Sequence, residues 1–421
     1  MEVERRAFEV AMANVRTREP VRNQARMCFE LLEDVLPEDH RARLLWRVVE
    51  TLDLGKFLRT RKAFEGRAGR SVTSPQVLLT LWLYAIAEGI GSAREIERRV
   101  GSDDAFRWIA GNEAVGRTTL SEFRATQGQA LDELLTEILG TLLHKGLVSL
   151  ALVAQDGTRI RAAASAPSFR SADGLAQCLE QARLHVKAVF AEADDPEVTE
   201  RERRAREAAA LDCERRVQEA IAEIARMRAE GKTAPRASTT DSDARIMKMG
   251  DGGFRPAYNV QFATAGDADG GPRTIVGVRV TNKGSDIGSI TPMLEEIEAR
   301  TGHVPNVLLA DGGHLHFDCV RNAAERGVDL IMPVRPASTA PTSKTAAQDP
   351  AVVAWRARMQ GDDAKTLYRA RAGLAELANA RVKGRLGLGQ FLLRGIERVT
   401  CVALLTAITH NVLSHASALV S

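Results

Sequence analysis

Apolar positions recur at helical spacing through the first third of the chain, which indicates an all-α front. From Val77 to Ile90 nearly every residue is apolar, so this segment predicts a buried helix. Ser74 followed by Pro75 is typical of the start of such a helix. We expect a helical N-terminal region over residues 1–70. A second helical domain follows over residues 71–146, where short helices and tight turns resemble a helix-turn-helix unit.

Strand-like runs begin after this helical part and alternate with helical segments. Leu150–Ala154 is a buried-strand run that should end at an aspartate, and Val307–Ala310 repeats that pattern. Tyr258–Thr264 alternates with a period of two and should pair with Thr274–Val280 as a hairpin. Strands interleaved with helices predict an α/β core with a mixed central sheet flanked by helices, over residues 147–415.

A long segment rich in Ala, Arg and Glu interrupts this core over residues 174–232. Its dense opposite charges and sparse apolar stripe predict a solvated helical hairpin or coiled coil. The sequence Asp194-Asp195-Pro196 is the expected break between its two helices. A solvent-facing hairpin is the favoured interpretation, and contact with DNA or with a partner subunit stays open.

Composition bounds the class of protein but does not announce a partner. The 421 residues carry a net charge of only +3, with 44% hydrophobic and 27% charged residues, which is typical of a soluble globular protein. No apolar run approaches the roughly 20 residues of a membrane span, and the charged N-terminus lacks the core of a signal peptide. We therefore expect a cytoplasmic protein with reduced thiols and no membrane contact, because its five cysteines are dispersed: Cys28, Cys178, Cys213, Cys319 and Cys401.

Two aspartates stand at the ends of predicted strands, each followed by glycine. Asp156 precedes Gly157, and Asp311 precedes two further glycines. Carboxylates that converge from rigid strands are the oxygen ligands that Mg²⁺ prefers, and two such ions can clamp a phosphoryl displacement. A simple strand-to-turn connection explains each Asp-Gly equally well. Glu376 lies in an Ala-rich helical segment, where the pattern alone favours a solvated face and leaves Asp362, Asp363 and Glu325 as competitors.

Together these segments resemble the DDE transposases of bacterial insertion sequences, whose catalytic core is RNase H-like. Asp156 and Asp311 lie in strings similar to the first two acidic motifs of the family. Its last motif, a Tyr, Arg, Glu and Lys signature on a helix, resembles Tyr368, Arg371, Glu376 and Lys383. The spacing from Arg371 to Glu376 is one residue longer than usual, and His314 stands where the family often has Tyr. Further similar strings are Ser74–Leu79, Gly91–Glu97, Asp104–Trp108, Asp243–Arg245 and Gly253–Gln261, so the likeness spans roughly residues 30–415.

The resemblance implies a DNA transposase that binds the terminal inverted repeats of an insertion sequence. Such an enzyme cleaves at the element ends and joins the freed 3′-OH to target DNA. The resemblance further implies that Asp156, Asp311 and Glu376 are catalytic and hold two Mg²⁺ ions, with Mn²⁺ as a substitute. It gives Tyr368 and Lys383, with Arg371, contacts to DNA phosphates near the cleaved end, and it implies a homodimer on DNA.

Other DNA contacts are expected from basic and hydroxyl side chains. Arg117, Thr119 and Arg124 occupy the first half of a predicted helix and have the chemistry for groove and phosphate contacts. A bundle that packs on the core without touching DNA fits these three residues equally well. Arg381 lies beside Lys383 on the signature helix, and the basic segment 59–70 could follow a DNA backbone.

Two other nucleic-acid functions stay open at this point, beside a helical scaffold with an α/β domain that does not act on nucleic acid. One is an RNase H-like nuclease that cuts without strand transfer, and the other is a catalytically silent DNA-binding protein that recognises the repeats. The presence of all three acidic residues argues against the silent form.

Overall fold

The computed structural model describes residues 29–59, 72–191, 198–267, 270–334 and 348–420. The chain divides into two compact units, Met1–Val35 and Leu36–Ser421. The described part of the first unit contains the short 3-10 helix η1 (Leu32–Val35). The fold considered below belongs to the second unit.

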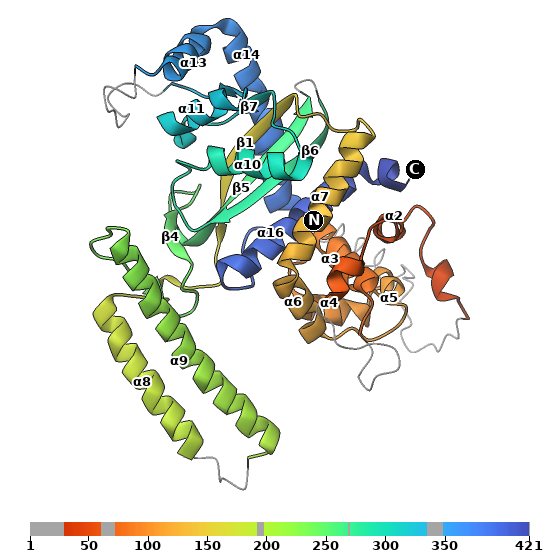
Figure 1. The fold of residues 1–421 in the computed structure, drawn as a ribbon. Coiled ribbons are helices and arrows are strands. Elements are labelled where there is room, and N and C mark those ends of the chain that lie inside the picture. Colours follow the sequence, from red (N-terminus) through yellow and green to blue (C-terminus); the bar gives the residue numbers. More distant parts are fainter. Residues whose placement is uncertain (1–28, 60–71, 192–197, 268–269, 335–347, 421) are drawn as a thin grey trace, which may run out of the picture. The chain divides into compact units, whose positions relative to one another are not determined.

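The predicted all-α front is present in the second unit (Figure 1). In helix α3 (Pro75–Ala87), ten consecutive residues from Leu78 to Ala87 are buried, as their largely apolar sequence requires. Ser74 caps this helix by accepting a hydrogen bond from the Gln76 N–H. Residues 1–28 and 60–71, including most of the basic segment, lie outside the described residues. The elements are α2 (Arg41–Glu50), η2 (Gly55–Leu58), α3 (Pro75–Ala87), α4 (Ala93–Val100), α5 (Asp104–Ile109), α6 (Arg117–Thr126) and α7 (Gly128–His144).

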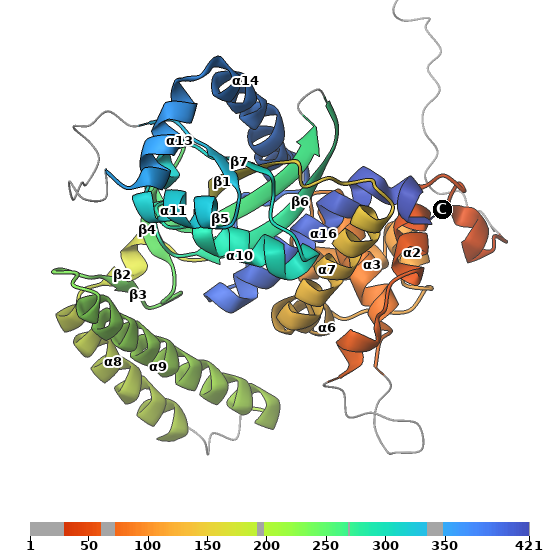
Figure 2. The same cartoon turned by 45° about the horizontal axis from the view of Figure 1, so that its top comes forward.

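A mixed sheet forms the α/β part, as predicted. Its order is β4-β5-β1-β7-β8, and β6 also pairs with β5. Strands β1, β7 and β8 run parallel, whereas β5 is antiparallel to β1, β4 and β6, so the predicted hairpin is confirmed. Figures 1 and 2 show helices on both sides of this sheet. The strands are β1 (Leu152–Arg161), β4 (Arg245–Lys248), β5 (Phe254–Asp267), β6 (Gly270–Thr281), β7 (Val307–Leu309) and β8 (Asp329–Ile331).

The first strand does not end at Asp156. Strand β1 continues through Asp156 and Gly157, because it pairs without interruption with β5 from Val153 to Arg161. The expectation of a strand-end Asp-Gly is therefore wrong for this pair. What ends near Asp156 is the parallel pairing with β7, whose last register pair is Ala154 with Leu309.

The predicted insertion is a pair of helices, α8 (Ala172–Ala191) and α9 (Glu200–Ala229), which we call the helical arm. Figures 1 and 2 show the two helices lying side by side. Apolar residues such as Leu175, Val217 and Ile224 form the seam between them. Two short strands, β2 (Phe169–Arg170) and β3 (Ala237–Ser238), pair at the base of the arm. The predicted break at residues 194–196 lies outside the described residues.

The last helix, α16 (Ile396–Val420), joins the sheet to the helical front. It packs against β6 and against α2, α3, α6 and α7. The Asn411 side chain accepts a hydrogen bond from Ile275 N–H and donates one to Ile275 O, both at 2.8 Å. By length and composition α16 could span a membrane, which its sequence pattern had not indicated. However, 78% of its apolar window is buried inside the protein, as in a core helix.

The remaining helices cover the sheet and carry the signature residues. Leu374 and Ala375 pack with Ala154, Leu309 and Ile331 on one face of the sheet. These helical elements are α10 (Ile290–Thr301), α11 (Phe317–Glu325), α13 (Pro350–Gln360), α14 (Asp362–Arg371), the π-helical segment η6 (Ala372–Glu376), α15 (Leu377–Ala380) and the second π-helical segment η7 (Arg381–Arg385).

Candidate active site

Asp156 on β1 and Asp311 just after the end of the parallel strand β7 lie at the same level. The last β1–β7 register pair is Ala154 with Leu309, and each aspartate follows two residues later. Asp311 caps the short turn after β7, because its Oδ1 accepts the Gly313 N–H at 2.7 Å. Proximity to Asp311 also raises the pKa of Asp156. The two carboxylates that the sequence placed far apart are therefore neighbours.

Glu376 is linked to Asp156 through the side chain of Arg371. The Arg371 guanidinium donates to Glu376 Oε1 at 2.6 Å and lies 3.8 Å from Asp156 Oδ1. The Arg371 side chain is only 15% exposed, whereas that of Glu376 is 55% exposed. One buried guanidinium thus bridges a strand carboxylate and a helix carboxylate.

A π turn explains how Arg371 can contact Glu376. Residues five apart on a regular α-helix point about 140° away from each other. Here the Leu377 N–H bonds to Ala372 O, five residues back, so the segment η6 makes one wide turn. That turn absorbs the extra residue between Arg371 and Glu376 and brings both side chains to one face. The carbonyl of Gly373 within the turn accepts the Arg273 Nε–H from β6 at 2.9 Å.

Asn379 and Lys383 continue the site along the same helix. The Asn379 amide donates to Asp156 Oδ2 at 3.1 Å, while its own Oδ1 is buried without a hydrogen-bond partner. Desolvation lowers the pKa of Lys383, and the nearby Asp156 carboxylate opposes that shift. Tyr368 is half-buried beside the sheet, and its ring centroid lies 5.8 Å from the Arg371 guanidinium.

Burial dominates the electrostatics of this site. It raises the pKa of Asp156 above its usual range, although the Arg371 charge and the Asn379 hydrogen bond oppose the shift. His314 is fully buried, and burial lowers its pKa, so the neutral imidazole is favoured. Its Nδ1 lies 2.7 Å from Ser289 Oγ, and its Nε2 lies 3.6 Å from Asp311 Oδ1. The His314 Nε2 atom is buried without a hydrogen-bond partner among the described residues, so His314 lies next to Asp311 but is not hydrogen-bonded to it.

A polar cluster packs under Gly157 on the opposite face of β1. Asp286 accepts hydrogen bonds from Asn259 at 2.7 Å, Gln261 at 2.6 Å and Arg159 at 3.3 Å. A Cβ on Gly157 would fall within 3.0 Å of this cluster. The absent side chain of Gly157 therefore makes room for these polar side chains.

The donor set suits a divalent cation, although the side chains are not arranged as a finished site. Three carboxylates and the orphaned amide oxygen of Asn379 are oxygen ligands of the kind that Mg²⁺ prefers. Within the described ranges, no group of three or more His, Cys, Asp and Glu side chains is placed to hold a metal ion. The Arg371 guanidinium lies between two of these carboxylates, 2.6 Å from Glu376 Oε1 and 3.8 Å from Asp156 Oδ1.

Comparison with protein families matches two parts of the chain. Residues 30–126 match a family described as a transposase domain (DUF772), and residues 230–412 match the transposase DDE domain. Together the matches cover more than half of the chain. The chain belongs to the insertion-sequence DDE transposases. Comparisons with curated proteins and with solved structures give no match.

The DNA contacts expected on α6 of this transposase fall into two groups. Arg117 is exposed at the start of α6, 3.8 Å from Glu97, and Thr119 is half-exposed beside it. Arg124, in contrast, is buried: its guanidinium lies 4.5 Å from the Trp82 ring centroid and donates to Gly91 O. The prediction that Arg124 contacts DNA is therefore wrong for this structure, because the residue lies in the core of the helical part.

Arg381 points away from the carboxylates. It donates to Ser414 Oγ of α16 at 3.3 Å, and burial together with the nearby Arg385 lowers its pKa. Among the competitors of Glu376, Asp362 is exposed at the far end of α14 and pairs with Lys365. The structure thus favours Glu376 over Asp362 as the third carboxylate.

The sequence did not single out several residues of this site. Asn379 lies three residues after Glu376, which a helical projection could have placed on the same face. Arg273 and Asp286 lie far along the chain from their partners, so no local pattern could have indicated their roles.

Proposed function

We propose that this transposase binds the terminal inverted repeats of its element, cleaves at the element ends and transfers the 3′-OH strand into target DNA. The proposal includes an RNase H-like core, which the mixed sheet flanked by helices supports. The observation that carries it is the contact of one guanidinium, Arg371, with both Asp156 and Glu376, while Asp311 lies beside Asp156.

In this proposal Asp156, Asp311 and Glu376 are the catalytic carboxylates and would hold two Mg²⁺ ions, with Mn²⁺ as a substitute. Such ions supply charge neutralisation at the attacking and leaving oxygens of a phosphoryl transfer. The buried environment of Asp156 strengthens every electrostatic interaction there. The Gly313 N–H and the Asn379 amide hold the carboxylates of Asp311 and Asp156 in place.

Arg371 has two tasks in the proposed mechanism. Before DNA arrives, it neutralises Asp156 and Glu376, which would otherwise repel each other. Its planar guanidinium also has the geometry to bind two oxygens of a phosphate. Lys383 lies on the same helix near Asp156, and Tyr368 adds an aromatic surface beside Arg371. These three residues would grip the DNA strand next to the cleaved bond.

The test uses the purified full chain and a labelled duplex that carries the end of its element. Wild type should nick the duplex only with a divalent cation, and Asp156→Asn, Asp311→Asn and Glu376→Gln should each abolish nicking. Asp362→Asn is the matched control, because its carboxylate lies on the same helical region but points to solvent. Equal nicking by wild type and Asp156→Asn would sink the catalytic assignment.

Precut ends separate the alternative functions. A transposase should join a precut 3′-OH end to a target plasmid, whereas a nuclease without strand transfer should not. A silent repeat-binding protein should shift the duplex in a gel and show neither reaction. Joining two ends further predicts a homodimer on DNA, which mass photometry of the complex would detect. We further propose that the protein is cytoplasmic.

A further inference from the structure

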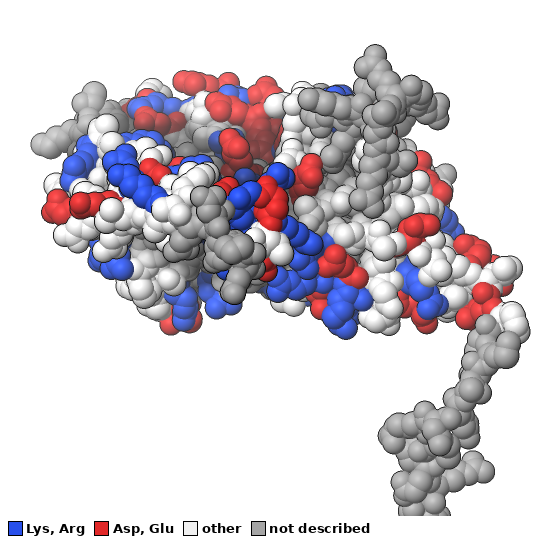
Figure 3. All heavy atoms as spheres, turned by 90° about the horizontal axis from the view of Figure 1, so that it is seen from below, with Lys and Arg blue, Asp and Glu red and all other residues white. Residues whose placement is uncertain are grey.

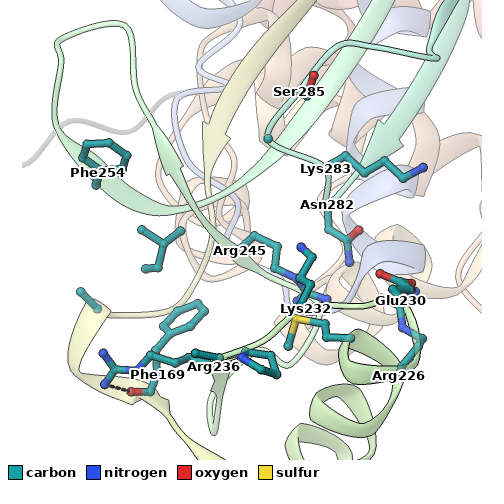
Figure 4. A pocket seen from close by; sticks show the side chains of 16 residues that line it. Phe169, Arg226, Glu230, Lys232, Arg236, Arg245, Phe254, Asn282, Lys283 and Ser285 are labelled. Carbon is teal, nitrogen blue, oxygen red and sulfur yellow. Dashed lines mark hydrogen bonds and ion pairs between the residues drawn. The ribbon is translucent and has the colours of Figure 1, made fainter. Parts of the chain in front are cut away.

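A hollow of about 900 Å³ lies between the base of the helical arm and the sheet (Figure 4). Its walls come from separate parts of the chain. They are the end of α9 with the segment that follows it, the strands β4 and β5 near their turn, and the segment Asn282–Ser285 after β6. Phe254 stands at one end of the hollow, and Arg226 and Glu230 stand at the other (Figure 4).

The charges of the lining do not cancel. Arg226 donates to Glu223 and, at 3.2 Å, to Glu230, while Arg245 donates to Glu223. These two arginines therefore neutralise the two carboxylates nearby. Three further lining cations have no carboxylate partner among the residues that the structure describes: Lys232, Arg236 and Lys283. The hollow thus presents about three positive charges to solvent.

The wall beneath these cations is rigid. Arg245 donates to three consecutive main-chain carbonyls, at 2.9 to 3.1 Å, and its side chain is only 12% exposed. This arginine fixes α9 to β4 through Glu223. Elsewhere in the lining, Phe254 is 67% exposed and Ile246 is 42% exposed. A preformed basic hollow is a suitable surface for the phosphate backbone of a nucleic acid.

The hollow connects with the candidate active site through main-chain and side-chain contacts. Gly284 lines the hollow, and its carbonyl accepts the Arg159 Nη2–H at 2.9 Å. Arg159 follows Asp156 on β1 and lies close enough to Lys383 to lower its pKa. Arg159, which also pairs with Asp286 at 3.3 Å, therefore links the segment that lines the hollow to the strand that carries Asp156.

We propose that this hollow binds the phosphate backbone of double-stranded DNA on the side of the cleaved bond that runs toward the helical arm. The proposal rests on the proposed function, because it extends the path of the same DNA substrate. The face seen in Figure 3 carries basic and acidic side chains side by side. Three uncompensated cations in one preformed hollow differ from such a mixed surface and match a run of phosphates.

The test removes the three lining cations that have no carboxylate partner among the described residues, one of which, Arg236, donates to Phe169 O at 2.9 Å, and measures how DNA binding depends on salt. The variant is Lys232→Ala, Arg236→Ala and Lys283→Ala combined, in the full chain. The control removes three cations from the far end of the arm: Lys187→Ala, Arg201→Ala and Arg206→Ala. Fluorescence anisotropy with an end duplex gives the dissociation constant at several salt concentrations. If all three cations contact phosphates, the slope of log K against log [salt] should fall by about 2.7 for the first variant and not for the control.

Several outcomes overturn the proposal. Unchanged slope and affinity in the first variant, or an equal loss in both triple variants, would refute it. So would equal competition by a polyglutamate peptide, because the hollow would then be a general anion site. Inorganic phosphate should compete weakly, since it engages only part of the hollow. Single substitutions such as Lys283→Gln, with thermal unfolding recorded, keep the test decisive if the triple variant folds poorly.

The design also separates this proposal from the proposed function. Asp156→Asn should lose cleavage and keep the wild-type salt slope, whereas the triple variant should lose slope. If the triple variant shows the expected loss of slope and the wild-type protein never cleaves, the hollow stands and the catalytic proposal fails.

Discussion

Gly157→Ala is the substitution that best tests how β1 is supported. The new Cβ would lie less than 3.0 Å from Gln261 Nε2 and from Asp286 Oδ1, and 3.0 Å from Asn259 Oδ1. Real Cβ atoms essentially never show contacts under 3.0 Å. None of the three groups can simply swing away, because Asn259 and Gln261 are buried and both donate to Asp286.

The expected loss in the free energy of unfolding follows from the side chains that the new Cβ must displace. Overpacking of a closed site costs about 1–3 kcal/mol. Displacing Asp286 or Gln261 also breaks at least one hydrogen bond to a carboxylate, worth about 1.5–3 kcal/mol. We therefore expect Gly157→Ala to lower the free energy of unfolding by about 3–5 kcal/mol. Since Asp156 is the preceding residue of the same strand, DNA cleavage should fall as well.

Urea denaturation followed by circular dichroism measures this loss. Gly140→Ala is the control, because a Cβ there meets nothing within 4 Å and lies inside the helix α7. That substitution should raise stability by about 0.5–1 kcal/mol. A Gly157→Ala protein within about 0.5 kcal/mol of wild type would refute the reasoning. Combination with Asp286→Ala should be clearly non-additive, because both changes act on one cluster.

Three further predictions concern single side chains. Without divalent cations, Asp156→Asn should raise the melting temperature near about pH 8. Burial raises the pKa of Asp156, so its ionised form opposes folding. The gain in melting temperature should therefore vanish as falling pH protonates the wild-type carboxyl. A gain in melting temperature that is the same at every pH contradicts this. Arg273→Ala, which frees the Gly373 carbonyl, should slow cleavage about 10- to 100-fold in a nicking assay, and Arg279→Ala on the same strand should not. Arg124→Met should lower the free energy of unfolding by about 2–4 kcal/mol in denaturation measurements and leave DNA affinity intact. Arg117→Ala should instead lower DNA affinity in anisotropy measurements and leave the free energy of unfolding unchanged.

Local patterns predicted most elements of this fold because those elements depend on local chemistry. The apolar run of α3, the hairpin of β5 with β6 and the two arm helices follow from periodicity and charge. The Asp156–Gly157 pair shows where this approach ends. Asp-Gly favours a turn locally, but the long antiparallel partner β5, about a hundred residues away, keeps the strand extended. Pairing of that range is not encoded in the dipeptide.

Arg124 shows the same limit for side chains. An arginine in a helix is usually exposed, and the sequence placed Arg124 in the first half of its helix, whereas it lies in the last turn of α6. Its burial depends on Trp82 and on the Gly91 carbonyl, which lie in two other segments of the helical front. Glu376 was inferred from the resemblance alone, and its contact with Arg371 depends on a π turn that composition does not reveal.

The π turn also bears on whether the longer spacing between Arg371 and Glu376 argues against Glu376 as a site residue. An extra residue in a regular helix would rotate Glu376 away from Arg371 by about 100° relative to a spacing of four. The structure absorbs that residue in η6, and a strand residue a hundred positions earlier, Arg273, satisfies a carbonyl of the widened turn. A fold that accommodates one extra residue in a helix needs a partner for the main-chain groups of the widened turn, and this hydrogen bond supplies one. The longer spacing therefore counts less against a working third carboxylate than the sequence alone indicates, and loss of cleavage in Arg273→Ala would follow from the same coupling.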